Sequence, residues 1–424
     1  MATISTASHV PAQHSLSASE RVFEGHDHAS LWFSLGVGLL VIQMGAYLVP
    51  AMGPREAMLA IVLGTAIGAG LLGWTAKLGA DSGLGSAGLM HRHFGRGFAR
   101  LPVLLNIAQL IGWTTFELVV MRDGTLAIVR QSLGLPGDGA AARLLATSVW
   151  GVLLALLLSG SMTQLVRKVI GRYGLPLVLL SLLWLTWQFG ARVQASGWTA
   201  FWARSGDGSM GLLSAMDLVI AMPISWLALV ADYARFGKSG KGALAGTWLG
   251  YAVANVWCYA LGVVVASVSE PGADLVGTLL LAQGGLIALS LILVDEIDNA
   301  YGDVYCAAVS SHSLLQRVPA QAWGVGLALL CTVLAWVLPM HELEPFLLTL
   351  SSVFVPLFGV ILGREGLSPQ GQSVRGAVNY AAAAIWLGGI ALFQWLLSAA
   401  PQWGATLPTL LVTAILARAA RRLG

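Results

Sequence analysis

Long apolar segments recur along the chain from Ser30 onward, separated by short polar breaks. An α-helix rises about 1.5 Å per residue, so about 20 apolar residues cross a hydrocarbon core of about 30 Å. Lipid offers no partner to unpaired backbone groups, which leaves helices as the structure for such segments. The pattern predicts an all-α integral membrane protein with twelve transmembrane helices. The predicted spans are residues 30–50, 55–78, 101–131, 143–159, 169–191, 212–234, 243–267, 277–310, 320–339, 344–363, 377–398 and 405–420.

Two of these spans contain residues that interrupt helices. The first has Gly36 and Gly38 ahead of Gln43, and the sixth has Pro223, which lacks a backbone donor and strains the turn before it. Because these spans are five apart, the pattern favours two five-helix halves related as inverted repeats, with substrate and ion near the membrane midplane. The alternative is that glycine and proline are simply common in membrane helices.

The composition agrees with a membrane protein. Charged residues make up 10% of the chain and hydrophobic residues 57%, whereas soluble proteins average about 25% charged residues. The net charge of +3 is too small to indicate a nucleic-acid partner. Cys258, Cys306 and Cys331 lie in separate apolar runs, so we predict packed thiols and neither disulfides nor a metal site. Residues 1–29 lack the basic start and apolar core of a cleavable signal, and we expect a mobile cytoplasmic tail.

The basic residues indicate the orientation, because cytoplasmic loops are enriched in Lys and Arg. If the tail is cytoplasmic, the 23 Lys and Arg residues divide into 17 on the inner side, five on the outer side and Arg122 within the third span. One helix too many or too few would destroy this bias. It therefore supports the helix count and predicts an inner (plasma) membrane protein with both termini in the cytoplasm. The five outer residues are Arg55, Arg130, Arg143, Arg192 and Arg204.

Polar residues within the third span mark a surface that faces a cavity, because a charge at the bilayer centre costs roughly 2.5–3.5 kcal/mol. Asn106, Gln109, Trp113 and Glu117 are three or four residues apart, so they share one face of the helix. Glu117 is the outstanding member of this face, because it is the only one that can carry a charge.

Arg122 and Asp123 follow on the same predicted helix. Adjacent residues on a helix point about 100° apart, so we expect each to find its partner elsewhere and to have a structural role. An alternative for Glu117 is that it is permanently protonated or paired with Arg122.

The eighth span carries Asp295, Glu296, Asp298, Asn299 and Asp303, which no lipid-facing helix would tolerate. Asp295, Asn299 and Asp303 follow a four-residue step, so we expect them to face the cavity and count Asp295 as a candidate substrate contact. Glu296 and Asp298 would then face neighbouring helices or the inner mouth. Alternatively, the helix ends earlier and Asp303 lies among the lipid headgroups.

Several motifs make a resemblance specific. They are Leu31-Trp32-Phe33, Gln43 to Tyr47, Phe94-Gly95, Asn106 through Gln109 to Trp113, Pro223 to Trp226 with Ala231 to Phe236, and Tyr305 to Ser310. Together they resemble the nucleobase:cation symporter family, and within it the hydroxymethylpyrimidine transporters of the CytX group, relatives of cytosine permease. The resemblance extends over about residues 30–420.

This resemblance implies a LeuT-type fold with a 5+5 inverted repeat and two appended helices. The first repeat would cover residues 30–191, the second 212–363, and the appended helices 377–420. The family's two ring-stacking tryptophans correspond to Trp113 and Trp226.

Three polar residues correspond to substrate contacts of the family. Its helix 1 amide corresponds to Gln43, and its base-binding asparagine of helix 8 to Asn299. Glu117 stands where hydantoin-transporting relatives have an amide. Two indoles can sandwich a flat ring, while these three side chains supply hydrogen-bonding groups for its edge.

The resemblance also implies a coupling cation, Na⁺ or H⁺. The helix 1 carbonyls that bind sodium in relatives would be those of Leu39 and Ile42. The two helix 8 hydroxyl ligands of those relatives become Leu293 and Val294, so the chain departs from the sodium site there. Asp295 could replace them as an ion ligand or carry a proton.

These observations predict a secondary active transporter that imports a pyrimidine-type heterocycle, with the aminopyrimidine precursor of thiamine as substrate and cytosine or a related base or hydantoin as the alternative. We expect the lipid bilayer and the small molecule as its partners, and no cofactor, nucleic acid or obligate protein partner. A channel would not need the interrupted helices, and an enzyme would need a nucleophile or metal constellation that the sequence lacks. A binding-only sensor remains open.

Overall fold

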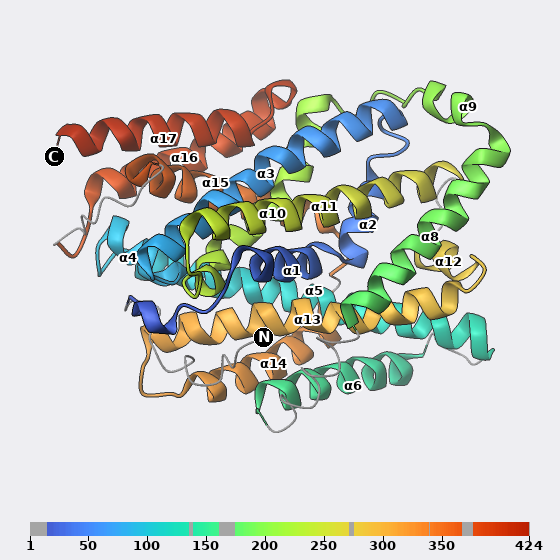
Figure 1. The fold of residues 1–424 in the computed structure, drawn as a ribbon, viewed down its shortest axis with the longest axis horizontal. Helices are drawn as coiled ribbons and strands as arrows, with labels where there is room; N and C mark the ends of the chain where they lie inside the picture. Colours follow the sequence, from blue (N-terminus) through green and yellow to red (C-terminus); the bar gives the residue numbers. More distant parts are fainter. Residues whose placement is uncertain are drawn as a thin grey trace.

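The computed structural model describes residues 15–134, 139–160, 174–270, 275–338, 340–366 and 376–423. These residues form a bundle of long helices that run roughly along one axis (Figure 1). The longer helices are α1 (Gly25–Gly36), α2 (Leu39–Tyr47), α3 (Pro54–Ser82), α4 (Ser86–Phe94), α5 (Arg100–Leu133), α6 (Ala140–Leu158), α8 (Leu175–Ser196), α10 (Leu212–Ala234), α11 (Gly240–Ser267), α13 (Gly285–Leu314), α14 (Ala320–Val337), α15 (Leu343–Glu365), α16 (Tyr380–Ala399) and α17 (Thr406–Leu423). The short helices α9 (Trp198–Ala203) and α12 (Leu275–Leu280) lie at one end.

Each of the twelve predicted spans overlaps a helix of the structure. Within the described ranges, nine helices are long and apolar enough to cross a membrane, and the bent pair α1–α2 would make a tenth. Helices α13 and α17 are not among the nine, and both carry several charged residues: Asp295, Glu296, Asp298 and Asp303 on α13, and Arg418, Arg421 and Arg422 on α17. The multi-pass character is therefore confirmed, while the number twelve and the 5+5 repeat stay predictions.

The first predicted span is bent, as its glycines indicated. Helices α1 and α2 meet at Val37 and Gly38 at an angle of 60°. The sixth span differs from the prediction, because α10 is one continuous helix with Pro223 inside it. The carbonyl that Pro223 leaves without a helical donor belongs to Val219, and the Tyr259 hydroxyl donates to it at 3.4 Å. A side chain from α11 thus replaces the missing bond, and α10 does not break.

The eighth predicted span, residues 277–310, is two helices rather than one. The helix α12 ends at Leu280, and α13 begins at Gly285 after a turn in which Gly284 has a φ of +71°. This left-handed conformation suits glycine, because it has no Cβ to clash. The polar residues of the span all lie on α13, beyond this turn.

Two of the polar residues on α5 hold it against α10. Asn106 Nδ2 donates to the Ala228 carbonyl at 2.9 Å, and Gln109 Nε2 donates to the Ser225 carbonyl at 3.0 Å. The four residues that were predicted to share one face of the third span therefore have two different roles. Its first two members fix the packing of α5 on α10, and the positions of Trp113 and Glu117 follow from that packing.

Residues 15–24 pack against the bundle, whereas we expected the whole of residues 1–29 to be a mobile tail. The backbone N–H groups of Val22 and Phe23 donate to the Phe236 carbonyl at 2.8 and 2.9 Å, and Lys238 N–H donates to the Phe23 carbonyl at 2.8 Å. Arg21 Nη1 donates to the Ala80 carbonyl at 2.8 Å. These bonds join the N-terminal segment to α3 and to the α10–α11 turn; residues 1–14 lie outside the described part of the chain.

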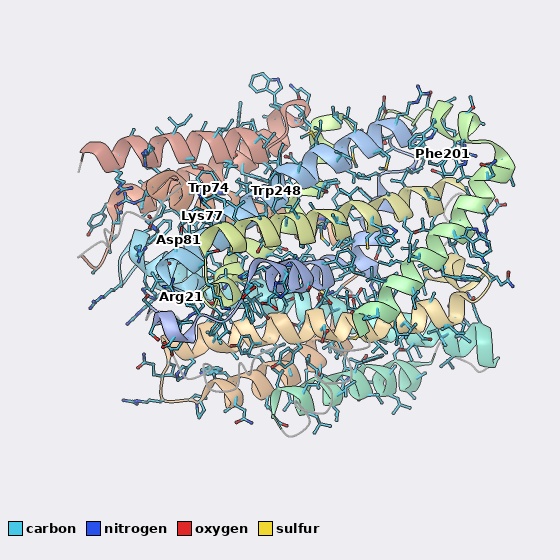
Figure 2. The ribbon with its side chains drawn as sticks, viewed as in Figure 1. Arg21, Trp74, Lys77, Asp81, Phe201 and Trp248 are labelled. Atoms are coloured by element: carbon cyan, nitrogen blue, oxygen red, sulfur yellow. The ribbon has the colours of Figure 1, made fainter. Side chains whose placement is uncertain are left out.

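Several described regions that are predicted to be cytoplasmic lie at one end of the bundle; the predicted inner loop around Arg167 lies outside the described residues. Figure 1 shows α4 and the C-terminus at this end, with α9 and α12 at the opposite end. Figure 2 shows Arg21 and Lys77 at the same end as α4, and Phe201 at the other. The bonds of Arg21 and Phe23 bring the α10–α11 turn to this end as well. The arrangement agrees with the sidedness that the basic residues predict.

Cysteine labelling tests this sidedness. We expect single cysteines at Arg96, Lys238 and Arg317, which are all exposed, to escape a membrane-impermeant thiol reagent in intact cells and to react after lysis. The native cysteines Cys258, Cys306 and Cys331 are buried, as predicted, and contribute little background.

The matched control for this experiment is a cysteine at the exposed Ser209, which lies after α9 and should react in intact cells. Reaction of two or more of the three test positions from outside would refute the predicted topology.

Candidate functional site

A cavity lies where α1 and α2 meet. It contains about 340 Å³ of space outside the protein atoms, part of it open to solvent. Residues of α1, α2, α5, α10, α11 and α13 line it. Six of its lining residues have polar or aromatic side chains: Trp113, Glu117, Trp226, Tyr251, Glu296 and Asn299.

Two side chains of α13 bind the backbone groups at the α1–α2 break. Leu39 N–H, the first of α2, donates to Glu296 Oε1. Asn299 Nδ2 donates to the Val37 carbonyl at 3.3 Å and to Glu296 Oε2 at 3.3 Å. Backbone groups at a helix end have no intrahelical partner, and leaving them unpaired at membrane depth is costly. These bonds therefore stabilise the break.

Helix α13 approaches the break closely at Gly38. A Cβ on Gly38 would lie 3.2 Å from Glu296 Oε1, so the carboxylate would have to shift slightly, and 3.5 Å from Asn299 Nδ2, which is ordinary contact. The backbone at Gly38 is extended, with φ of 177°, so its conformation does not call for glycine.

Helix α5 contributes Trp113 and Glu117, which are four residues apart and so point to the same side. Glu117 is 3% exposed, and its Oε2 has no hydrogen-bond partner among the described residues. Arg122 is not its partner, because Arg122 Nε donates to Asp123 Oδ1 at 2.7 Å and Nη1 donates to the Ala335 carbonyl at 3.1 Å. The expectation that Arg122 and Asp123 would not pair is thus wrong, since the long Arg122 side chain turns back onto its neighbour.

The two tryptophans reach the cavity from different helices, Trp113 from α5 and Trp226 from α10. Trp113 packs at 78° to Phe346 with 5.0 Å between ring centroids, and Trp226 packs at 85° to Trp32 at 5.8 Å. Neither ring is stacked in parallel on another ring in the described part of the chain. Both rings pack edge-to-face against neighbouring rings while they line the cavity.

Carboxyl groups determine the electrostatic character of this region. Glu117 interacts electrostatically with Asp303 and with Glu296, and all three are at most 3% exposed. No Lys or Arg is among the residues that line the cavity. Carboxylates only accept hydrogen bonds, so this arrangement favours ligands that carry donors or positive charge.

Of the residues predicted for the substrate site, Trp113, Glu117, Trp226 and Asn299 line the cavity. Gln43 does not; it is exposed, one turn along α2.

The carboxylates on α13 lie differently from the expectation. Asp295 and Asp303 are buried but are not among the lining residues, whereas Glu296 is. The three-residue step from Glu296 to Asn299 places these two residues on the cavity face. Asp303 interacts electrostatically with Glu117, and the roles of Asp295 and Asp303 stay predictions.

Of the groups predicted to bind the cation, the Ile42 carbonyl is directed at α11, since a Cβ on Gly262 would lie 2.0 Å from it. Leu293 and Val294, which stand where sodium-coupled relatives have hydroxyl ligands, face elsewhere: Leu293 packs on α5, where a Cβ on Gly124 would lie 2.6 Å from its Cδ2, and Val294 is 44% exposed. The assignment of Leu39, Ile42 and Asp295 as ion ligands therefore stays a prediction.

The fold is similar to that of known transporters. A structure titled as Mhp1, a nucleobase-cation-symport-1 family transporter with bromovinylhydantoin bound, has a TM-score of 0.78 and 14% identity, and the match covers 98% of this chain and 94% of that one. The inward-facing conformation of Mhp1 has a TM-score of 0.79 and 15% identity over 97% and 92% of the two chains. MhsT in complex with L-phenylalanine has a TM-score of 0.60 and 15% identity over 93% and 97%. At such low identity these likenesses establish the fold alone.

No curated protein matches the chain significantly. A family model described as permease for cytosine/purines, uracil, thiamine, allantoin matches residues 16–415, which is nearly the whole chain. The chain therefore belongs to this family of membrane permeases, and it is a transporter rather than an enzyme.

Proposed function

We propose that the protein is a secondary active transporter that imports hydroxymethylpyrimidine, the aminopyrimidine precursor of thiamine, by cation-coupled alternating access. The observation that carries this proposal is the pairing of two indole rings, Trp113 and Trp226, with the carboxylate of Glu117 around one buried cavity. Stacking on an aromatic side chain contributes roughly 1–3 kcal/mol per base and accepts any flat ring. The polar groups must therefore select the substrate.

Glu117 is the group that distinguishes an aminopyrimidine. Its carboxylate accepts a hydrogen bond from an exocyclic amino group and engages the neighbouring ring nitrogen, which favours the protonated ring. Hydrogen bonds to a charged partner are roughly twice as strong as neutral ones. Cytosine carries the same amino group beside a ring nitrogen and is the alternative substrate on the same argument.

The remaining parts of the proposal concern energy supply and location. The coupling cation is Na⁺ or H⁺, with Leu39, Ile42 and Asp295 as the groups that we assign to it. The protein lies in the plasma membrane with both termini in the cytoplasm, and residues 30–191 and 212–363 form the two repeats. The 60° bend between α1 and α2 supports a substrate site at a discontinuous helix.

Uptake of labelled hydroxymethylpyrimidine and cytosine into cells tests the proposed function. We expect uptake above that of cells lacking the transporter, and its loss when the coupling gradient is removed. A protonophore abolishes it if the cation is H⁺, and replacement of sodium by choline abolishes it if the cation is Na⁺. Equilibration without accumulation under every gradient would contradict active transport.

Replacing either tryptophan tests the stacking. We expect Trp113→Ala and Trp226→Ala each to weaken binding of the pyrimidine by about 1–3 kcal/mol, the contribution of one stacked aromatic, measured by titration of the purified protein. Trp74→Ala is the matched control, because Trp74 lies away from the cavity and donates to the Gly366 carbonyl (Figure 2). Unchanged affinity in both cavity variants would exclude the sandwich.

Glu117→Gln tests recognition of the amino group. We expect a loss of roughly 1.5–3 kcal/mol in binding of the aminopyrimidine, because a hydrogen bond to a charged group is lost, and a far smaller loss for the same ring without the amino group. Glu344→Gln is the control, since this carboxylate accepts from Tyr47 and is not among the cavity-lining residues. Equal losses for both rings would mean that Glu117 supports the fold or the ion cycle.

A further inference from the structure

The orientation of the Asn299 side-chain amide is fixed by its neighbours. The NH₂ group of Asn299 faces two oxygen acceptors, the Val37 carbonyl and Glu296 Oε2, each at 3.3 Å. A flipped amide would place Oδ1 against both of these oxygens and lose both bonds. The Val37 carbonyl cannot donate, and Glu296 in its ionised form only accepts, so only one of the two orientations is then compatible with both neighbours.

This orientation leaves the oxygen of Asn299 for the ligand. Oδ1 is buried and has no hydrogen-bond partner among the described residues, and Asn299, 6% exposed, lines the cavity. A buried polar atom without a partner costs free energy, so a donor from a bound ligand would stabilise it. The side chain thus presents an acceptor where an unrestrained asparagine could present either group.

Glu296 is itself held in a single position. Its Oε1 accepts from Leu39 N–H at the start of α2, and the absence of a Cβ at Gly38 allows the carboxylate to lie against the backbone. The same carboxylate therefore joins the α1–α2 break to the amide of Asn299. Neither Leu39 nor Glu296 can turn without changing what Asn299 presents.

We propose that Glu296 is a positioning residue that fixes Asn299 with its oxygen toward the substrate, so that the site selects rings that carry an amino group over rings with an oxo group at that edge. The inference rests on the proposed function for the location of the substrate, and it adds a second acceptor to that of Glu117. An oxo group would place its oxygen against the oxygen of Asn299. Two buried acceptors would then lack a donor, so the ligand would bind much more weakly.

The test compares binding of amino and oxo forms of the same ring to the purified, full-length protein. The probes are matched pairs built on pyrimidine, purine and hydantoin-like rings, so the selectivity is measured on whichever ring binds. We expect the unmodified protein to prefer the amino form by about 10- to 100-fold, the equivalent of one hydrogen bond lost from a buried partner. A preference for the oxo form would overturn the inference before any substitution is made.

Glu296→Gln is the decisive substitution. The oxygen of the new amide still accepts from Leu39 N–H, which turns its NH₂ group toward Asn299, and two NH₂ groups cannot bond each other. Asn299 can bond to the new amide only by turning its own NH₂ group toward the cavity, which costs it the bond to the Val37 carbonyl. We expect the amino-to-oxo preference to fall by about 10-fold or more, while monodispersity on size exclusion stays that of the unmodified protein.

The double substitution Glu296→Gln with Asn299→Asp is the matched control. It exchanges the carboxylate and the amide, so the net charge and the bond between positions 296 and 299 are kept and an acceptor again faces the cavity, while the bond from position 299 to the Val37 carbonyl is lost. We expect the amino preference to return to within a few-fold of the original. A merely structural role of Glu296 would not predict this recovery.

Each outcome decides between the hypotheses. An unchanged preference in Glu296→Gln, or a lost preference that the double substitution does not restore, would overturn the positioning role. Binding of another ring pair but not of the pyrimidine pair would contradict the proposed substrate while still deciding the role of Glu296. Binding of no ring pair at all would overturn both.

Discussion

The need to pair backbone polar groups inside a membrane governs the arrangement of this protein. Where α1 ends and α2 begins, α13 supplies Glu296 and Asn299 to the free N–H and carbonyl groups of the break. Where Pro223 removes a bond within α10, the Tyr259 hydroxyl of α11 replaces it. The cavity lies at the first of these places because a helix break brings polar side chains to a depth where lipid would otherwise exclude them.

Much of the fold could be predicted from the sequence, because hydrophobic length and helical period are local properties. Every predicted span overlaps a helix, and the shared face of Trp113 and Glu117 points into the cavity as expected. The errors concern partners that no local pattern specifies. Continuity of α10 depends on a hydroxyl from another helix, and the pairing of Arg122 with Asp123 depends on side-chain reach. Glu296 was misplaced because two steps, of three and four residues, are equally compatible with one helix face.

The cavity is lined by two kinds of side chain that recognise a ligand in different ways. Indole rings bind through contact area and distinguish little between flat ligands, whereas carboxylates act on charge and on hydrogen atoms. Since no Lys or Arg lines the cavity, ionised carboxyl groups there require a proton or a positively charged ligand for balance. In the proposed function, the same groups that select a donor-bearing ring therefore make its binding sensitive to the charge that enters with it. The proposal thus links substrate selection to cation coupling through one set of side chains.

The N-terminal segment has a mechanical consequence. Three main-chain hydrogen bonds join Val22 and Phe23 to the turn between α10 and α11. They lie at the polar end of the bundle, where water can replace a broken bond, so each contributes only about 0.5–1.5 kcal/mol net. The bonds beside Gly38 are made by buried side chains of α13, and breaking them leaves buried polar groups unpaired, which costs more free energy. Releasing the N-terminal segment from the α10–α11 turn therefore costs less than separating α13 from the α1–α2 break.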